Sequence, residues 1–382
     1  MYLVCHSFLF QAAYKSKPAA YISSIKNRFT SAETVSLPEI KQKCVLVYLE
    51  ASKSMYIGFK GSNDLDDWLV NLDTDMVILD DFLYEERKES EMKRSKLEVF
   101  GPKVKSHAGF TKRAQAWMDI LVPKIEEFDP DFIYTTGHSL GAATSSMVHI
   151  MLAREFCPKI RDGCDTVINN VTFALPLFGN LDLKSHLQFQ ASENMKNMFH
   201  FVNYTDLVPA IALMPHVYSN LSYPIQKALS NPSFWTNLFM FFGKIKPETS
   251  EEKVELKQIA SNLSKEIAKK KGNLHALFEK ILPETYMPIG NYIFMKGSDL
   301  HEFSFKQDSD HQWIGQILVE SLKILNRIHS KHLITIGYTG ENKQVCEEIL
   351  KNHAIETYGS QMTECLTNGV HDNFMSWKME SD

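Results

Sequence analysis

The chain has 382 residues, which is enough to bury a large core and exceeds one ordinary domain without demanding two. Hydrophobic residues make up 44% and charged residues 23%, an ordinary globular balance that excludes wholesale disorder. The formal net charge of -5 argues against a nucleic acid as the main partner.

The N-terminal segment begins with a short apolar run that lacks the basic region of a signal peptide. Lys15 and Lys17 follow that run closely. We therefore expect a first helix that packs on the core rather than a cleaved signal. No apolar run approaches the ~20 residues of a membrane span, so we predict no transmembrane segment.

The six cysteines show no tight pairing of the metal-binding type, so we predict no metal site. Cys157 and Cys164 could form a disulfide in an oxidising compartment. Scattered thiols in a chain of this length fit a reducing compartment better, so we expect a cytoplasmic protein, with secretion less favoured. The cysteines are Cys5, Cys44, Cys157, Cys164, Cys346 and Cys365.

Residues up to about Ile40 read as helical and loop-like. Two β-rich runs follow at residues 44–49 and 55–59, and the polar segment 50–54 separates them. This pattern is typical of a β-hairpin.

A strand-to-helix turn is predicted at residues 132–143, FIYTTGHSLGAA. A β-prone run leads into the G-x-S-x-G pattern that contains Ser139, and small, helix-compatible residues follow it. In such a nucleophile elbow the serine backbone is strained, and flanking glycines are needed because a Cβ would collide with the neighbouring strand or helix. The turn would hold the Ser139 hydroxyl clear of the sheet and aim the amides of the new helix at the reaction centre.

The end of the second β-rich run, FKGSND at residues 59–64, allows two interpretations. Acyl transfer places negative charge on a carbonyl oxygen, and backbone amides must already point at that oxygen. The amides of Ser62 and Leu140 would form such a pair. The alternative is a plain turn at the end of a strand.

An acidic partner for the serine is predicted at Asp206. This residue follows the β-prone segment 199–205, so it would lie at the carboxyl end of a parallel strand, on the catalytic rim of the sheet. A carboxylate there could accept the Nδ1–H of a histidine and hold it in the correct tautomer. Asp165 and Asp182 are rivals by proximity only and read as solvated loop residues.

The histidine is harder to assign. The hydrolase order of serine, acid and histidine places it after Asp206, on a loop beyond a late strand. Residues 288–295 read as that strand, and 308–313 read as a polar turn that opens a helix at 314–325. His301 reads more readily as a strand-end surface residue, and His216 as structural. The candidates are His216, His275, His301, His311, His329, His332, His353 and His371.

A helical insertion is predicted at about residues 218–287, before the late strand. Residues 234–242 are densely aromatic, and apolar residues at helical spacing follow beyond Pro247. Phe234 and Trp235 could belong to a lid that covers an acyl site and contacts a lipid interface. Equally, these aromatic residues could form the core of the insertion itself. Residues 63–69 are a second lid candidate, with Trp68 as the apolar contact.

Several segments together resemble the class 3 (fungal-type) lipases, members of the α/β-hydrolase superfamily, in order and spacing. They are FKGSNDLDDWLVNL, VKSHAGF, GHSLGAA, VTFALPLFGN and FVNYTDLVPAI. The resemblance covers about residues 44–206 and a short piece near His311. Lys60 stands where that family usually has Arg, Ala142 where it often has Gly, and residues 173–179 depart slightly from its F-G-x-P-x-x-G segment.

This resemblance implies an α/β fold with a mostly parallel central sheet flanked by helices. We expect one domain over residues 1–382, with the helical insertion and a C-terminal helical extension at about 314–382. We assign this extension no function; a closing helical layer and a surface for a partner are its alternatives. Asp206 matches the acid of the D-x-V-P motif, and Asp310-His311 with Trp313 resembles the histidine loop, which favours His311 as the base. His107 and Gly109 are expected to support the structure, and His138 to pack within the elbow.

The resemblance also implies a serine hydrolase that cleaves carboxylic esters of lipids. His311, oriented by Asp206, would take the proton of Ser139, and an acyl-enzyme would form and be hydrolysed without a metal or other cofactor. Expected partners are an acylglycerol, phospholipid or small ester and, peripherally, a lipid interface. A lipase-like signalling or binding protein and an acyltransferase that uses the same serine remain alternatives.

Overall fold

The computed structural model describes roughly two fifths of the chain, and every structural statement below concerns that part. The described residues are 11–15, 21–22, 31–61, 76–79, 103–156, 166–189, 191, 193–203, 206, 209, 286–296, 299–303 and 353–367.

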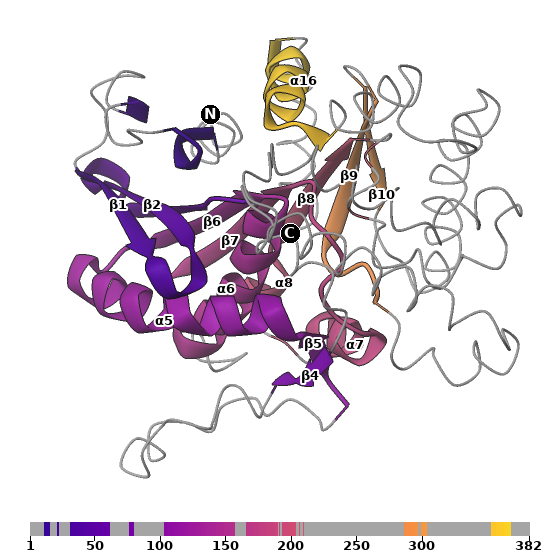
Figure 1. The fold of residues 1–382 in the computed structure, drawn as a ribbon, viewed down its shortest axis with the longest axis horizontal. Helices are drawn as coiled ribbons and strands as arrows, with labels where there is room; N and C mark the ends of the chain where they lie inside the picture. The colour runs from indigo at the N-terminus through magenta and orange to yellow at the C-terminus, as the bar shows by residue number, and fades with distance from the viewer. Residues whose placement is uncertain are drawn as a thin grey trace, which may run out of the picture.

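An eight-stranded sheet forms the centre of the fold, with strand order β1-β2-β3-β6-β7-β8-β9-β10 (Figure 1). The five strands from β3 to β9 in this order run parallel, whereas the pairs β1–β2, β2–β3 and β9–β10 are antiparallel. The strands are β1 (Ser31–Leu37), β2 (Gln42–Leu49), β3 (Ser54–Phe59), β6 (Phe132–His138), β7 (Val167–Phe173), β8 (Met198–Asn203), β9 (Asn291–Lys296) and β10 (Asp299–Phe303). The predicted α/β class with a mostly parallel sheet is confirmed.

The N-terminal edge of the sheet both confirms and corrects the sequence analysis. The predicted hairpin is present as β2 and β3, joined by the 3-10 turn Glu50–Ser52 and by Lys53 in a left-handed conformation. The segment expected to be helical or loop-like contains β1 and the 3-10 turn Pro38–Ile40. Most of β1 is exposed or half-buried, so it lacks the apolar alternation that predicts a strand. Pairing with β2 makes it an edge strand.

Helices cover both faces of the sheet, as α/β architecture requires. On one face α6 (Leu140–Phe156) packs on β6, β7 and β3, with α5 (Ala108–Phe128) beside it and the short α8 (Glu193–Lys196) nearby. The helix α16 (Ile355–Thr367) lies on the opposite face, above β8 and β9 in Figure 1. The remaining elements are α7 (Leu181–Phe189) and the two-stranded ribbon of β4 (Met76–Ile78) and β5 (Lys105–His107).

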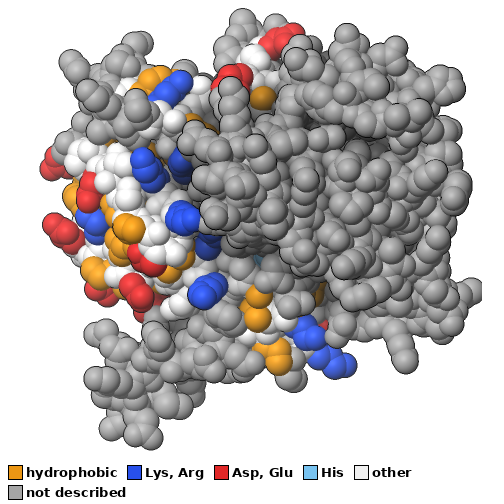
Figure 2. All heavy atoms as spheres, viewed as in Figure 1, with side chains coloured by type: hydrophobic (Ala, Val, Ile, Leu, Met, Phe, Trp, Pro, Cys, Tyr) orange, Lys and Arg blue, Asp and Glu red, His pale blue; other side chains and the backbone are white. Residues whose placement is uncertain are grey.

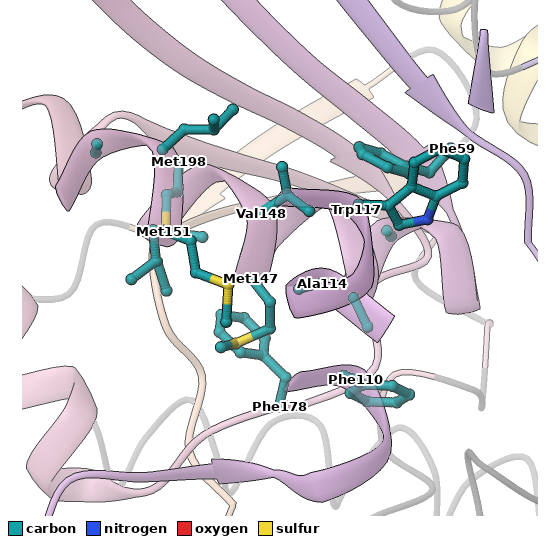
Figure 3. Close-up of a cluster of buried hydrophobic side chains, with 14 of the residues drawn as sticks. Phe59, Phe110, Ala114, Trp117, Met147, Val148, Met151, Phe178 and Met198 are labelled. Carbon is teal, nitrogen blue, oxygen red and sulfur yellow. The ribbon is translucent and has the colours of Figure 1, made fainter. Parts of the chain in front are cut away.

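Strand side chains alternate between two buried layers, because successive residues of a strand point to opposite faces. Cys44 and Leu46 of β2 lie in the layer that α5 and α6 cover, while Val45 and Val47 pack with Ala12, Ala13 and Ile22 of the N-terminal segment. The larger layer joins helix and sheet side chains such as Phe59, Trp117 and Met147 (Figure 3).

The described surface mixes side chains of every kind. In Figure 2 acidic, basic and hydrophobic side chains are interspersed over it, and among the described residues the large hydrophobic side chain that is exposed is Phe132. No helix in the described ranges has both the length and the apolarity needed to cross a bilayer.

Two fully buried histidines lie on the core side of the sheet. Burial lowers the pKa of His149, on α6, to about 4, and that of His200, on β8, to about 3. His200 Nδ1 lies 2.6 Å from the hydroxyl of Thr172. Both rings are therefore neutral in the folded protein at pH values where an exposed histidine is already protonated.

We predict that these histidines make the fold sensitive to acid. Above pH 6.5, their ordinary pKa, both histidines are neutral in the folded and the unfolded chain, so their protonation does not reduce the free energy of unfolding. Below pH 6.5 the unfolded chain takes up protons that the folded chain refuses until about pH 4 and 3, so the free energy of unfolding falls by up to about 1.4 kcal/mol per pH unit for each histidine.

Urea unfolding between pH 7 and 4.5 measures this slope. The variant His149→Gln/His200→Gln is expected to have a clearly shallower slope than the wild type, whatever its absolute stability. Equal slopes would contradict the prediction.

Candidate active site

Ser139 occupies the sharp turn between β6 and α6 that the sequence predicts. Its φ angle is 58°, a left-handed conformation that costs roughly 1–2 kcal/mol for a residue with a side chain. Its amide donates to the carbonyl of Phe173 at 3.1 Å, and its carbonyl accepts from the amide of Ala142 at 2.9 Å. These bonds hold the strained residue between the sheet and the new helix.

The two glycines of the turn are required by close approach of backbone atoms. A Cβ on Gly137 would overlap the carbonyl of Gly141. A Cβ on Gly141 would overlap the carbonyl of Phe59, and it would lie within 3 Å of backbone atoms of Lys60 and Gly61. The end of β3 therefore lies directly against the start of α6.

Ser139, His353 and Asp206 form a hydrogen-bonded chain. His353 Nε2 lies 3.0 Å from Ser139 Oγ, and His353 Nδ1 lies 2.8 Å from Asp206 Oδ2. An ionised carboxylate can only accept, so Nδ1 carries the proton and Nε2 is left to accept from the serine hydroxyl. All three residues are buried. The chain of bonds can remove a proton from Ser139 and stabilise the imidazolium that results.

The histidine in this chain differs from the one that the sequence analysis favoured. His311 lies outside the described residues, and the imidazole that lies between Ser139 and Asp206 is that of His353. His353 was one of the candidates after Asp206, but no strand or polar turn of its own distinguished it. It precedes α16 by two residues, and the packing of that helix on the sheet brings it to the site.

Tyr358, on the first turn of α16, holds the carboxylate of Asp206. Its hydroxyl donates to Asp206 Oδ2 at 2.7 Å and accepts from the amide of Asn203 at 2.9 Å. Burial, and next the charge of Asp206, raise the pKa of Tyr358 well above its usual value, so the hydroxyl stays protonated and continues to donate. Tyr358 was not predicted from the sequence, where it is marked only by its position in a polar helical stretch that follows a candidate histidine.

His138 does more than pack within the elbow. Its Nε2 donates to the carbonyl of His353 at 2.8 Å, because a carbonyl can only accept. Burial, and next the nearby His353, lower the pKa of His138 well below its usual value, so the ring is neutral. Nδ1 must then accept, and the hydroxyl of Tyr14 donates to it at 3.2 Å. Segments from both halves of the chain thus meet at the elbow.

His107 lies at the start of α5, where its ring accepts from the amide of Phe110 at 3.4 Å and stacks on the Phe110 side chain. Gly109 lies in the first turn of α5. The bond from the Phe110 amide makes His107 the N-cap of this helix.

Of the two predicted oxyanion amides, that of Leu140 begins α6 next to Ser139, and Ser62 lies outside the described residues. The lid candidates Trp68, Phe234 and Trp235 and the insertion at 218–287 also lie outside them. Within the described ranges no group of histidine, cysteine and acidic side chains is arranged to hold a metal ion.

The chain matches a known family over part of its length. Residues 56–216 match the sequence family described as Lipase (class 3). No curated protein matches the chain.

Solved lipases are distant structural neighbours. The chain is similar to the triacylglyceride lipase of Rhizomucor miehei, with 17% identity, a TM-score of 0.40 and coverage of 55% of this chain and 73% of that one. A triacylglycerol lipase described as having a serine protease triad gives 14% identity, a TM-score of 0.45 and coverage of 83% and 92%. The Lip2 lipase of Yarrowia lipolytica has 17% identity and a TM-score of 0.41, with coverage of 55% of this chain and 72% of that one.

We predict that Gly141→Ala destabilises the protein by about 3 kcal/mol or more, because the new methyl group meets backbone atoms that cannot rotate away. Helix propensity alone would favour alanine by about 1 kcal/mol, so the two effects have opposite signs. Urea denaturation of the variant and the wild type decides between them. A variant as stable as the wild type would show that β3 and α6 do not touch here.

We also predict a strong coupling between Tyr358 and Asp206. A hydrogen bond to a buried charged group contributes about 1.5–3 kcal/mol, so Tyr358→Phe is expected to cost more stability than Tyr292→Phe, a buried tyrosine that contacts His200 instead. In a double-mutant cycle with Asp206→Asn, the coupling energy should exceed about 1 kcal/mol. Additive losses would mean that the hydroxyl does not support the carboxylate.

Proposed function

We propose that this protein is a serine hydrolase that cleaves carboxylic esters of lipids, because residues 56–216 match the class 3 lipase family and the fold is a mostly parallel sheet flanked by helices. The observation that carries the proposal is the hydrogen-bonded chain of Ser139, His353 and Asp206 at the elbow. His353 takes the place that the sequence analysis gave to His311. The predicted nucleophile and acid are retained.

In the proposed reaction His353 Nε2 accepts the proton of Ser139 as Oγ attacks the ester carbonyl carbon. The tetrahedral intermediate places negative charge on the former carbonyl oxygen, and the amides of Leu140 and Ser62 stabilise it. The imidazolium protonates the leaving alcohol, and an acyl-enzyme remains. Water then attacks the acyl carbon with His353 again as the base, and this releases the acid and restores Ser139.

The surroundings of the site support these roles. Asp206 is held by the Tyr358 hydroxyl, so its carboxylate is fixed while it orients His353. His138 is neutral and bonded to the backbone of His353, so it fixes the base without competing for the proton. Holding Ser139, His353 and Asp206 in the reactive geometry lowers the barrier of the reaction.

An acylglycerol or a phospholipid is the proposed substrate class, because the family is one of lipases. A lid that contacts a lipid interface remains a prediction. Its candidates are the aromatic residues Phe234 and Trp235 of the predicted insertion and the segment around Trp68. The cytoplasmic location inferred from the cysteines also remains a prediction.

The proposal is tested by hydrolysis of a short p-nitrophenyl ester and of emulsified triacylglycerol and phosphatidylcholine. Ser139→Ala and His353→Ala are each expected to lower kcat by roughly three orders of magnitude or more, and Asp206→Asn by a similar or smaller factor. His311→Ala is the matched control and is expected to keep most of the activity.

Loss of activity in His311→Ala with activity retained in His353→Ala would return the base to His311. Wild-type protein without Ser139-dependent hydrolysis of any ester would instead favour a lipase-like binding protein. Transfer of the acyl group to an added alcohol in preference to water would favour an acyltransferase.

A further inference from the structure

Gln42, the first residue of β2, connects four elements through one buried side-chain amide. Its Oε1 accepts from the indole of Trp117 on α5 at 2.8 Å. Its Nε2 donates to the carbonyl of Lys60, just beyond β3, at 3.0 Å, and lies 3.2 Å from the hydroxyl of Thr144 on α6. Gln42 is only 3% exposed, so it faces the interior and not solvent.

The partners determine which way the amide of Gln42 points. An indole N–H can only donate, so it requires the amide oxygen, and the carbonyl of Lys60 can only accept, so it requires the amide nitrogen. The Thr144 hydroxyl donates to the carbonyl of Leu140 at 3.1 Å and so accepts from Gln42. Every bond agrees with one orientation, and the amide links the carbonyl of Lys60 to that of Leu140 through Thr144.

One end of this link carries a proposed oxyanion donor, the amide of Leu140. The other end, Lys60, precedes Ser62, the second proposed donor, by two residues in the sequence. Near this link the backbone of residues 59–61 packs so closely against Gly141 of α6 that a Cβ at Gly141 would overlap it. Steric contact sets how closely the segments approach, and the bonds of Gln42 restrain sliding along that contact.

Steric contact alone does not require a polar residue at this position. A buried amide loses its hydration and is tolerated only when hydrogen bonds within the protein replace those to water. An apolar side chain would fill the same space without this desolvation cost. The use of Gln42 therefore points to a need for directional bonds between β3 and α6. Oxyanion stabilisation has that need, because the donors must be fixed before charge develops.

We propose that Gln42 is a positioning residue for the oxyanion site, which fixes the end of β3 relative to the Leu140 amide at the start of α6. This inference rests on the proposed hydrolase function. Gln42 touches neither substrate nor the reacting atoms and acts through Lys60 and Thr144.

The test compares Gln42→Met, which keeps the length of the side chain and removes its bonds, with the matched control Asn170→Leu. Asn170 is a fully buried amide on β7 that bonds Thr135 on β6 and, further along α6 than Thr144, Ser145 and Ser146. For ester hydrolysis, Gln42→Met should lower kcat about 100-fold with KM within about 3-fold of wild type, whereas Asn170→Leu should stay within about 5-fold in kcat.

A second readout separates positioning from a loss of structure. The Ser139 oxygen adds to the carbonyl carbon of a trifluoromethyl ketone while His353 takes the hydroxyl proton. The electron pair of the broken C=O π bond then forms an oxyanion, so the inhibition constant reports the oxyanion site. For Gln42→Met the inhibition constant should rise by about the same factor by which kcat/KM falls. The Tm should fall no more than in Asn170→Leu. Thr144→Val breaks the same link at its other end and should give a smaller loss, about 10-fold, even where Gln42→Met does not fold.

The outcomes separate the two claims. Wild-type activity that depends on Ser139, with kcat and inhibitor binding unchanged in both Gln42→Met and Thr144→Val, would overturn the role of Gln42 and leave the hydrolase standing. Equal losses in Gln42→Met and Asn170→Leu would also overturn it, because a general loss of packing would explain both. Absence of Ser139-dependent hydrolysis in the wild type would overturn both proposals.

Discussion

The strained backbone at Ser139 is the constraint on which the site depends. A left-handed serine between β6 and α6 is possible only because glycine stands at 137 and at 141, where side chains would meet the backbone of α6 and of β3. This close packing brings the carboxyl end of β3 against the first turn of α6. The hydroxyl is thereby presented beside the amides of a helix N-terminus, which suits a developing negative charge.

The remaining parts of the site come from distant segments that the sheet brings together. Asp206 follows β8 at the same end of the parallel sheet as the elbow, because parallel strands present their carboxyl ends together. His353 arrives from near the C-terminus with α16, whose buried Tyr358 and Met362 pack on β7, β8 and β9. The helix α16 therefore supplies a packing face and the hydroxyl that bonds Asp206, and His353 adjoins its N-terminus.

The sequence predicted the parts of this arrangement that have a local pattern. The elbow is specified within a few residues by its glycines, and Asp206 by the β-prone run before it. The β2–β3 hairpin and β9 were also predicted correctly, because β-prone apolar runs mark the strands and a polar segment separates the two strands of the hairpin. These features need no knowledge of how distant segments meet.

The parts that the sequence did not predict depend on tertiary contact. His353 lies before an ordinary amphipathic helix, and only the docking of α16 distinguishes it from the other histidines after Asp206. Gln42 has no local signal either, since its value lies in partners on α5, α6 and the end of β3. The strand β1 was misread because its exposed, polar sequence becomes a strand only by pairing with β2.

The most direct measurement of the central claim is peptide mapping after treatment with a fluorophosphonate probe, which reacts with an activated serine. The account predicts a single modified serine, Ser139, in the wild-type protein, and greatly slowed modification of Ser139 when His353 is replaced by alanine. A wild-type protein whose Ser139 remains unmodified, or a His353→Ala protein modified at the wild-type rate, would contradict it.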